Sequence, residues 1–345
     1  MNSTQLQDMG DTQFCFEFVN ISCPKTNRST AVHVALYILF VVIIIITILG
    51  NSLVMLSILH FRKLQTPTNY LVLSLAVTDF LVGLIVLPYS MIRSVDTCWY
   101  FGDIFCKIHS GLDMVLTITS IYHLCFIAID RYYAVCEPLL YTTKITLPVI
   151  GIFITFSWVF SIVYGFALIY SDANVYGIED YISAISCYGS CVLIFNKLWG
   201  HLDPLIAFFV PVLVIVYIYL KIFFVARQHA RAIGNVMHRK NVKQENNIGG
   251  SHKKEFKAAV KLGVVIGVFI ICWLPFFIIT IVDPYIDFST PPAVFEMFVW
   301  LGYFNSTCNP MLYAFFYPWF RKALKMIISC KIFEDDSTML NMYPE

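Results

Sequence analysis

The strongest constraint on the fold is a series of long apolar segments separated by short polar ones. The clearest lies in the first segment, where Val41–Leu49 reads VVIIIITIL. A helix needs about 20 mostly apolar residues to cross a bilayer, and seven segments reach that length: 33–60, 68–93, 104–136, 146–170, 200–226, 258–282 and 294–317. They lack the two-residue alternation of a transmembrane barrel. The sequence therefore predicts an all-α membrane protein, a seven-transmembrane helix bundle.

Composition excludes the soluble classes. Hydrophobic residues make up 59% of the chain and charged residues 13%, whereas soluble proteins carry about 25% charged residues. The formal net charge is +1, so the chain lacks the basic field that holds nucleic-acid backbones. Membrane lipid is the expected surrounding, and no nucleic-acid partner is expected.

Basic residues predict the orientation in the membrane. Only five of the 23 Lys and Arg residues fall on one side of the predicted spans: Lys25, Arg28, Arg93, Lys107 and Lys197. The positive-inside bias therefore places the amino terminus outside the plasma membrane and the carboxyl terminus in the cytosol. Glycosylation sequons agree with this orientation, since they begin at Asn2, Asn20 and Asn27.

These assignments define the domain organisation. An extracellular glycosylated tail at 1–32 precedes the seven-helix domain at 33–317, whose polar third cytosolic loop covers about 228–257. Residues 318–330 have the two-faced pattern of an amphipathic helix lying on the inner leaflet, and 331–345 form a cytosolic tail. Cys330, at the end of the amphipathic helix, is a candidate for palmitoylation.

The outer side is expected to hold disulfides, because thiols oxidise outside the cell. Six cysteines fall there: Cys15, Cys23, Cys98, Cys106, Cys187 and Cys191. A bridge between Cys106 and Cys191 is the first pairing we expect. The sequence leaves the remaining connectivity open.

Charged residues inside the predicted spans point to function, because burying a charge in a bilayer is costly. Asp79, Asp113, the pair Asp130-Arg131 and Asp203 are such residues. Asp113 lies about two turns inside the third span and Asp203 in the outer third of the fifth, and neither has a Lys or Arg in a nearby span. Two unpaired carboxylates facing one cavity would trap a cation from outside. Alternatively, each is satisfied by backbone or hydroxyl groups, or protonated by burial.

Aromatic side chains lie at a depth that matches Asp113. Ring faces attract an ammonium group by about 0.5–2 kcal/mol per contact, so these residues are expected to wall a cation pocket, although such a stripe is also typical of core packing. They are Trp273, Phe276, Phe277, Trp300 and Tyr303.

The chain resembles the rhodopsin-like (class A) G-protein-coupled receptors over its whole length. One motif of that family falls in each span: Gly50-Asn51, Leu75-Ala-x-x-Asp79, Asp130-Arg131-Tyr132, Trp158, Pro211, Phe269-x-x-Cys-Trp273-Leu-Pro275 and Asn309-Pro-x-x-Tyr313. Within the family, the runs Asn305–Phe320 and Cys98–Asp103 are similar to the trace amine-associated receptors.

This resemblance implies an amine ligand held by Asp113, with Trp273 as the floor of the pocket. Met114, Thr117 and Thr280 are further expected lining residues. Asp203 resembles the second acid of the fish-type subgroup that recognises diamines such as cadaverine, and Pro204 beside it makes the local backbone uncertain. The alternative is a monoamine receptor in which Asp113 is the sole anchor.

The resemblance also implies an allosteric sodium site and a cytosolic switch. Na⁺ is the only cofactor expected, held by Asp79 with Ser120, Asn305 and Asn309. In the switch, Arg131 would pair with Asp130 and with Glu255, and Leu139 would contact the G protein. Further switch residues are Tyr132, Phe269, Pro211, Tyr219 and Tyr313.

Partners follow from the same family: a heterotrimeric G protein of the stimulatory or olfactory type that raises cAMP, and arrestin. The resemblance implies the Cys106–Cys191 disulfide and a bridge from Cys187 to Cys23 or Cys15. A cation channel or amine transporter is the alternative class, but it predicts repeated halves, which the sequence lacks. An enzyme is not expected, since no metal-ligand spacing or nucleophile motif is present.

Overall fold

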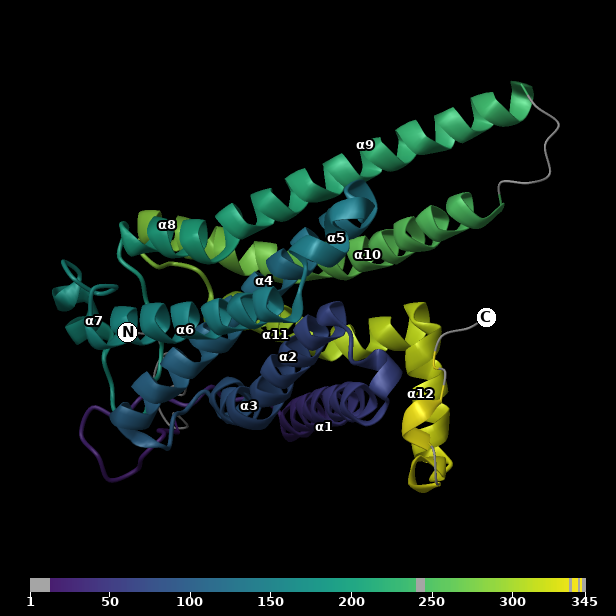
Figure 1. Ribbon diagram of the computed structural model, residues 1–345. Helices are drawn as coiled ribbons and strands as arrows, with labels where there is room; N and C mark the ends of the chain where they lie inside the picture. The colour runs from purple at the N-terminus through teal and green to yellow at the C-terminus, as the bar shows by residue number, and fades with distance from the viewer. Residues whose placement is uncertain (1–12, 240–245, 335–336, 341, 343–345) are drawn as a thin grey trace.

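The protein is a bundle of long helices in a computed structural model. The structure describes residues 13–239, 246–334, 337–340 and 342, and of residues 226, 229–239, 246–259 and 262 it describes the backbone only. The long helices run roughly side by side, and a short helix lies across one end of the bundle (Figure 1). Within these ranges there is no strand, only isolated bridges such as Phe14 with Pro24.

Six helical segments are long and apolar enough to cross a membrane: Thr30–His60, Pro67–Asp96, Gly102–Cys136, Leu147–Tyr170, Trp199–Val225 and Gly263–Tyr285. A seventh long helix, α11 (Pro292–Phe316), packs against α10 (Asn246–Val282) and α1 (Thr30–His60). Each of the seven predicted spans therefore corresponds to a helical segment of the bundle.

The second span is not a continuous α-helix. It begins as α2 (Pro67–Leu81), where the Thr66 hydroxyl caps the first turn, passes through a π-helical stretch at Val82–Val86, and ends as α3 (Leu87–Asp96). Pro88 has no N–H to donate to the preceding turn, which favours such a widened turn. Because the π turn holds an extra residue, α3 is rotated by about 100° relative to a regular continuation.

The fifth span has the same kind of interruption. Short α8 (Trp199–Pro204) leads through a π-helical stretch at Leu205–Phe209 into α9 (Val210–Arg239). Pro204 and Pro211 flank this stretch, so two N–H groups are missing from the helix ladder. The sequence left the backbone beside Asp203 uncertain, and the structure has a helix there with a widened turn.

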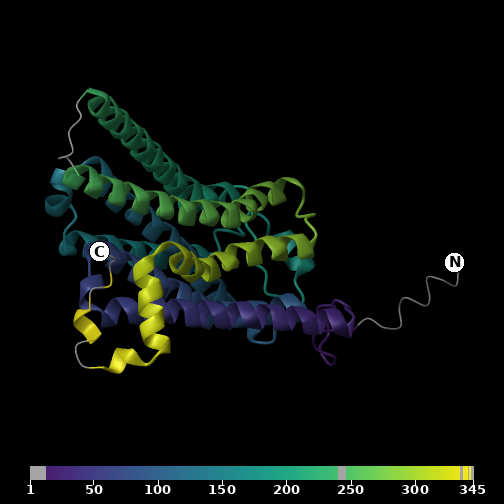
Figure 2. The same ribbon diagram turned by 90° about the vertical axis from the view of Figure 1, so that its right-hand side faces the viewer.

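The remaining helices are α4 (Gly102–Cys136), α6 (Leu147–Tyr170), the loop helices α5 (Pro138–Lys144) and α7 (Glu179–Ile185), and α12 (Pro318–Ile328). Short 3₁₀ turns lie at Arg62–Leu64, Asp283–Tyr285, Lys331–Phe333 and Ser337–Met339. The helix α12 matches the predicted amphipathic segment. It lies at the end of the bundle opposite the segment that leads from Gln13 into α1 (Figure 2).

The polar stretch expected to form the third cytosolic loop is largely helical. Residues 228–239 extend α9 and residues 246–257 begin α10, so most of the polar stretch 228–257 has a helical backbone. The pattern of polar residues indicates contact with water, but water contacts a projecting helix as readily as a loop. Both helices extend beyond the rest of the bundle (Figure 1).

Candidate ligand-binding site

A cavity of about 470 Å³ opens at the end of the bundle near the amino-terminal segment. Its walls come from the amino-terminal segment, α3, α4, the loop before α8, α8 and the π-helical stretch after it, α10, and α11 with the residue before it. Eight of the ten residues expected from the sequence line it: Asp113, Met114, Thr117, Asp203, Trp273, Phe276, Phe277 and Tyr303. A volume in this range suits a small organic ligand.

Asp113 lies on α4 and is partly buried. The Tyr303 hydroxyl donates a hydrogen bond of 2.5 Å to its Oδ2, and the Ser90 hydroxyl lies 3.3 Å from the same Tyr303 oxygen. Hydroxyl donors stabilise a carboxylate without neutralising its charge. Asp113 can therefore accept a hydrogen bond from Tyr303 and still attract a cation.

Asp203 lies on α8 and is 4% exposed. Tyr164, on α6, donates a hydrogen bond of 3.1 Å to its Oδ1. The π-helical stretch that follows does not turn Asp203 away, since its side chain lines the same cavity as Asp113. Two acidic side chains from different helices thus share one space.

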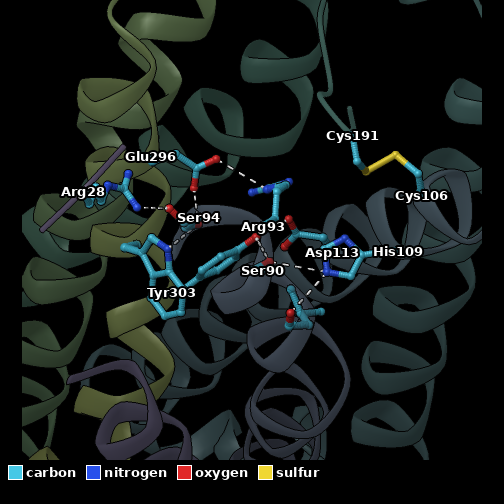
Figure 3. A network of polar contacts seen from close by, with 12 residues as sticks. Arg28, Ser90, Arg93, Ser94, Cys106, His109, Asp113, Cys191, Glu296 and Tyr303 are labelled. Carbon is cyan, nitrogen blue, oxygen red and sulfur yellow. Dashed lines mark hydrogen bonds and ion pairs between the residues drawn. A yellow bond between two sulfur atoms is a disulfide. The ribbon is translucent and has the colours of Figure 1, made fainter. Parts of the chain in front are cut away.

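The expectation that no basic residue lies near Asp113 was wrong. Arg93, in the last turn of α3, lines the cavity and is within electrostatic range of Asp113, Tyr303 and Glu296. In Figure 3 the Arg93 guanidinium lies between the carboxylates of Asp113 and Glu296. The sequence assigned Arg93 to the outer surface because it ends the second apolar segment. In the structure α3 follows a π-helical stretch, and an extra residue in a helical turn changes the direction of every side chain after it.

The floor of the cavity is aromatic. The ring centroid of Trp273 lies 5.8 Å from that of Phe276, 6.0 Å from Phe277 and 6.3 Å from Tyr303. Trp273 packs directly on the backbone of α11, because a Cβ added at Gly302 would lie 2.7 Å from its ring. Such rings can hold an ammonium group against their faces.

Two expected lining residues lie elsewhere. Trp300 stacks on Phe40 of α1 with ring centroids 3.7 Å apart, and its indole N–H donates to the Ser94 hydroxyl at 3.0 Å. The Thr280 hydroxyl donates to the Phe276 carbonyl within its own helix. Trp300 and Tyr303 are three residues apart, but only Tyr303 has the rotation about the axis of α11 that faces the cavity.

The outer rim is tied together by three disulfides. Cys106 and Cys191 form the expected bridge, and Cys187 pairs with Cys23, one of the two partners considered. The third disulfide, Cys15–Cys98, was left open by the sequence. Residues from this cross-linked rim line the cavity, which the sequence did not indicate; among them are Ser190, Cys191, Leu193, Phe195 and Glu296 on α11.

Two of the four expected sodium-site residues, Asp79 and Asn309, are in contact in the buried interior of the bundle, and Ser120 and Asn305 are buried as well. Asp79 is buried and accepts hydrogen bonds from Ser306 at 2.8 Å and Asn309 at 2.7 Å. Among the described residues, the buried Ser120 hydroxyl, the Asn309 Oδ1 atom and the Asn305 Nδ2 atom have no hydrogen-bond partner. The two oxygen atoms can bind a cation, whereas the amide nitrogen is a donor. A hard cation takes oxygen ligands, and one carboxylate with hydroxyl and amide groups nearby fits a singly charged ion. Ser306 is a member of this cluster that the sequence did not single out.

At the other end of the bundle, Asp130 and Arg131 form an ion pair of 2.5 Å. Asp130 also accepts hydrogen bonds from Thr68 at 2.9 Å and from Tyr141 of α5 at 3.1 Å. Burial, reinforced by the Asp130 carboxylate, raises the pKa of Tyr141, so its hydroxyl stays protonated. The side chain of Glu255 lies outside the described part of the chain, so its pairing with Arg131 stays a prediction.

Other expected switch residues occupy the core or the surface. Phe269 and Pro211 are buried, and Tyr132 donates to Glu137 at 3.3 Å. The buried hydroxyls of Tyr219 and Tyr313 have no hydrogen-bond partner among the described residues. Leu139 on α5 is 92% exposed, and its contact with a G protein stays a prediction.

The expected modification sites that the structure describes are accessible. Asn20, Asn27 and Cys330 are exposed. Asn2 lies outside the described residues.

Comparison with known proteins places these features in one family. Residues 50–313 match the family model "7 transmembrane receptor (rhodopsin family)". The chain is 52% identical over 344 residues to trace amine-associated receptor 4 of Rattus norvegicus, covering 100% of this chain and 99% of the relative. It is 49% identical to trace amine-associated receptor 13c of Danio rerio, with 98% of both chains covered.

A human protein of the same receptor group is similar to the chain to the same degree. Trace amine-associated receptor 2 of Homo sapiens is 50% identical over 333 residues, which cover 96% of this chain and 93% of the relative. Similarity at this level over nearly the whole length extends beyond the shared motifs. The chain is therefore a multi-pass receptor of the plasma membrane, not an enzyme, and it belongs to the trace amine-associated receptors within the rhodopsin family of G-protein-coupled receptors.

Proposed function

We propose that this receptor recognises diamines, with one ammonium group bound at Asp113 and the other at Asp203. The observation that carries the proposal is that both side chains line one cavity. Each has a tyrosine hydroxyl as a donor, from Tyr303 and Tyr164. A monoamine would compensate only one of the two acids, and an uncompensated buried charge costs several kcal/mol.

The test is a cAMP reporter assay in cells that express the full chain, using linear diamines and monoamines of graded length. Diamines of one preferred length are expected to act at concentrations about 10- to 100-fold lower than monoamines of the same carbon number, because only they neutralise both acids. Equal potency of matched diamines and monoamines at every length would favour the monoamine alternative, with Asp113 as sole anchor.

Signalling would proceed through the inner half of the bundle. Ligand binding would favour the state in which the inner end of α10 swings outward, since a ligand shifts an equilibrium only by its preference for one state. Trp273 on the cavity floor, the ion pair of Asp130 and Arg131, and the exposed Leu139 lie along this route. We infer coupling to a stimulatory or olfactory G protein, a rise in cAMP, later arrestin binding and an olfactory role.

The orientation that this function requires has the amino terminus outside. Three disulfides gather at the cavity end of the bundle, and disulfides persist outside the cell rather than in the cytosol. The opposite end holds α12, the exposed Cys330 and the basic extensions of α9 and α10. Glycans at Asn2, Asn20 and Asn27 and a palmitoyl group at Cys330 belong to the same proposal.

A sodium ion at Asp79 would oppose activation. The ion would be held by Asp79 with Ser120, Asn305 and Asn309, and would supply a positive charge that stabilises the buried carboxylate in the inactive bundle. Sodium binding at Asp79 would then lower the affinity of the amine cavity for its agonist through a coupling free energy between the two sites.

We expect agonist affinity to be about 5- to 20-fold lower in NaCl than in KCl of equal concentration, as measured by radioligand competition on membranes. Asp79→Asn removes the charge that attracts the ion and should abolish this difference. A sodium effect that persists in Asp79→Asn would contradict the assignment of the site.

A further inference from the structure

We propose that Arg93 is a built-in competitor of the amine ligand: its guanidinium shares Asp113 with the incoming ammonium group, and Glu296 determines how strongly it competes. The inference rests on the proposed amine recognition at Asp113. It makes Arg93 and Glu296 specificity-determining residues of the cavity, although neither needs to contact the ligand.

The first step is the position of Arg93. Its side chain is 17% exposed and lines the cavity together with Asp113 and Glu296. It comes from α3, whereas Asp113 is on α4 and Glu296 on α11. Figure 3 shows the guanidinium between the two carboxylates. The Arg93 guanidinium can therefore interact with either Asp113 or Glu296.

The second step is that Glu296 is held firmly by other groups. The Ser94 hydroxyl donates to its Oε2 at 2.5 Å, and the Trp300 indole donates to the same Ser94 hydroxyl at 3.0 Å. Trp300 is itself stacked on Phe40. Arg28 of the amino-terminal segment donates to the Ser94 and Val95 carbonyls at 2.9 and 2.6 Å. Glu296 is therefore a fixed charge at the rim.

The third step is that Arg93 is held less firmly than Glu296. Its Nε lies 3.4 Å from Glu296 Oε1, an ion-pair distance, and this Nε makes no hydrogen bond among the described residues. The guanidinium also lies beside the Tyr303 hydroxyl and Asp113, so it is shared among several groups and not fixed at Nε by a hydrogen bond, and a long side chain of this kind can shift between them. Arg93 can therefore move toward Glu296 when another cation reaches Asp113.

The balance of charges in the cavity explains why the position of Arg93 affects ligand binding. Without ligand, one guanidinium serves both Asp113 and Glu296. When an ammonium group binds Asp113, two cations face two acids, and Arg93 is left to pair with Glu296. Ligand binding must nevertheless overcome repulsion between two like charges in a partly dehydrated cavity, where charges interact more strongly than in water.

Removing the charge of Arg93 and removing the charge of Glu296 are expected to change amine potency in opposite directions. Arg93→Met keeps the apolar part of the side chain and removes the competing charge, so the concentrations of cadaverine and of n-pentylamine for half-maximal cAMP should both fall about 10-fold. Glu296→Gln keeps the Ser94 contact and removes the charge that draws Arg93 away, so both concentrations should rise about 10-fold. Arg93→Lys, with its charge kept, should stay near wild type.

The decisive measurement is the double variant in the full-length receptor, at surface expression matched by antibody binding. If Glu296 acts through Arg93, Arg93→Met/Glu296→Gln behaves like Arg93→Met alone. If Glu296→Gln reduces amine potency as much in the Arg93→Met background as in wild type, the proposal is overturned, since Glu296 would then attract the ligand directly. Higher half-maximal concentrations in Arg93→Met would also overturn it.

These outcomes are distinct from a failure of the proposed function. If wild-type receptor responds to neither amine, amine recognition at Asp113 is refuted. If wild type responds and Arg93→Met has wild-type potency for both amines, only the competition by Arg93 is refuted.

Discussion

Replacing Asp113 with alanine is expected to abolish the response to amines while the receptor still reaches the cell surface. The carboxylate is the acid that Tyr303 orients at 2.5 Å, and removing one partner of a buried ion pair costs about 3–5 kcal/mol. Since about 1.4 kcal/mol corresponds to a factor of ten, potency should fall by at least about 100-fold. The measurement is a cAMP dose–response curve with surface expression determined in parallel.

A matched control is available on the same helix. Asp103 is exposed in the first turn of α4 and does not line the cavity, so Asp103→Ala removes the same charge without touching the site. It should leave potency within about 3-fold of wild type, because exposed charges contribute little. An Asp113→Ala receptor with wild-type potency would remove the basis for the binding site.

Replacing Asp203 with asparagine is expected to weaken diamines selectively. The amide retains an oxygen that can accept the Tyr164 hydrogen bond but loses the charge that pairs with the second ammonium group. Cadaverine should lose about 10- to 100-fold in potency, and n-pentylamine should be spared or become more potent, because its binding no longer leaves an uncompensated acid. The ratio of the two potencies is the quantity to measure.

Tyr164→Phe is the companion variant. It removes the hydroxyl donor and leaves the Asp203 charge in place, so the preference for the diamine should persist. An equal loss of both amines in Asp203→Asn would contradict the two-anchor proposal, since the carboxylate would then support the fold of the cavity rather than one end of a ligand.

Arg93 lies near Asp113 and Glu296. It faces Asp113 rather than Asp203, so a competing guanidinium should alter monoamine and diamine potency alike, whereas Asp203 should separate them. Comparing the same two amines in both sets of variants therefore distinguishes a competing charge from a second anchor.

The sequence by itself determined the helices and pointed to the acids of the candidate site. A span is recognised by about 20 consecutive apolar residues, a local property, so every predicted helix is found in the structure. The acids Asp113 and Asp203 stood out for the same reason, because a charge within an apolar segment is visible without knowledge of the fold. The Cys106–Cys191 bridge was also expected from the positions of the two cysteines and the family resemblance.

Only the tertiary structure decided which face each side chain presents. Trp300 and Tyr303 both lie on α11, yet one packs on Phe40 and the other donates to Asp113. Arg93 lines the cavity from α3, which follows the π-helical stretch at Val82–Val86 and is therefore not the regular continuation of α2 that the sequence suggests. The pairing of Cys15 with Cys98 likewise depends on how the amino-terminal segment folds over the rim. Apolar length specifies that a segment crosses the membrane, but its rotation and its partners depend on contacts between residues far apart in the chain.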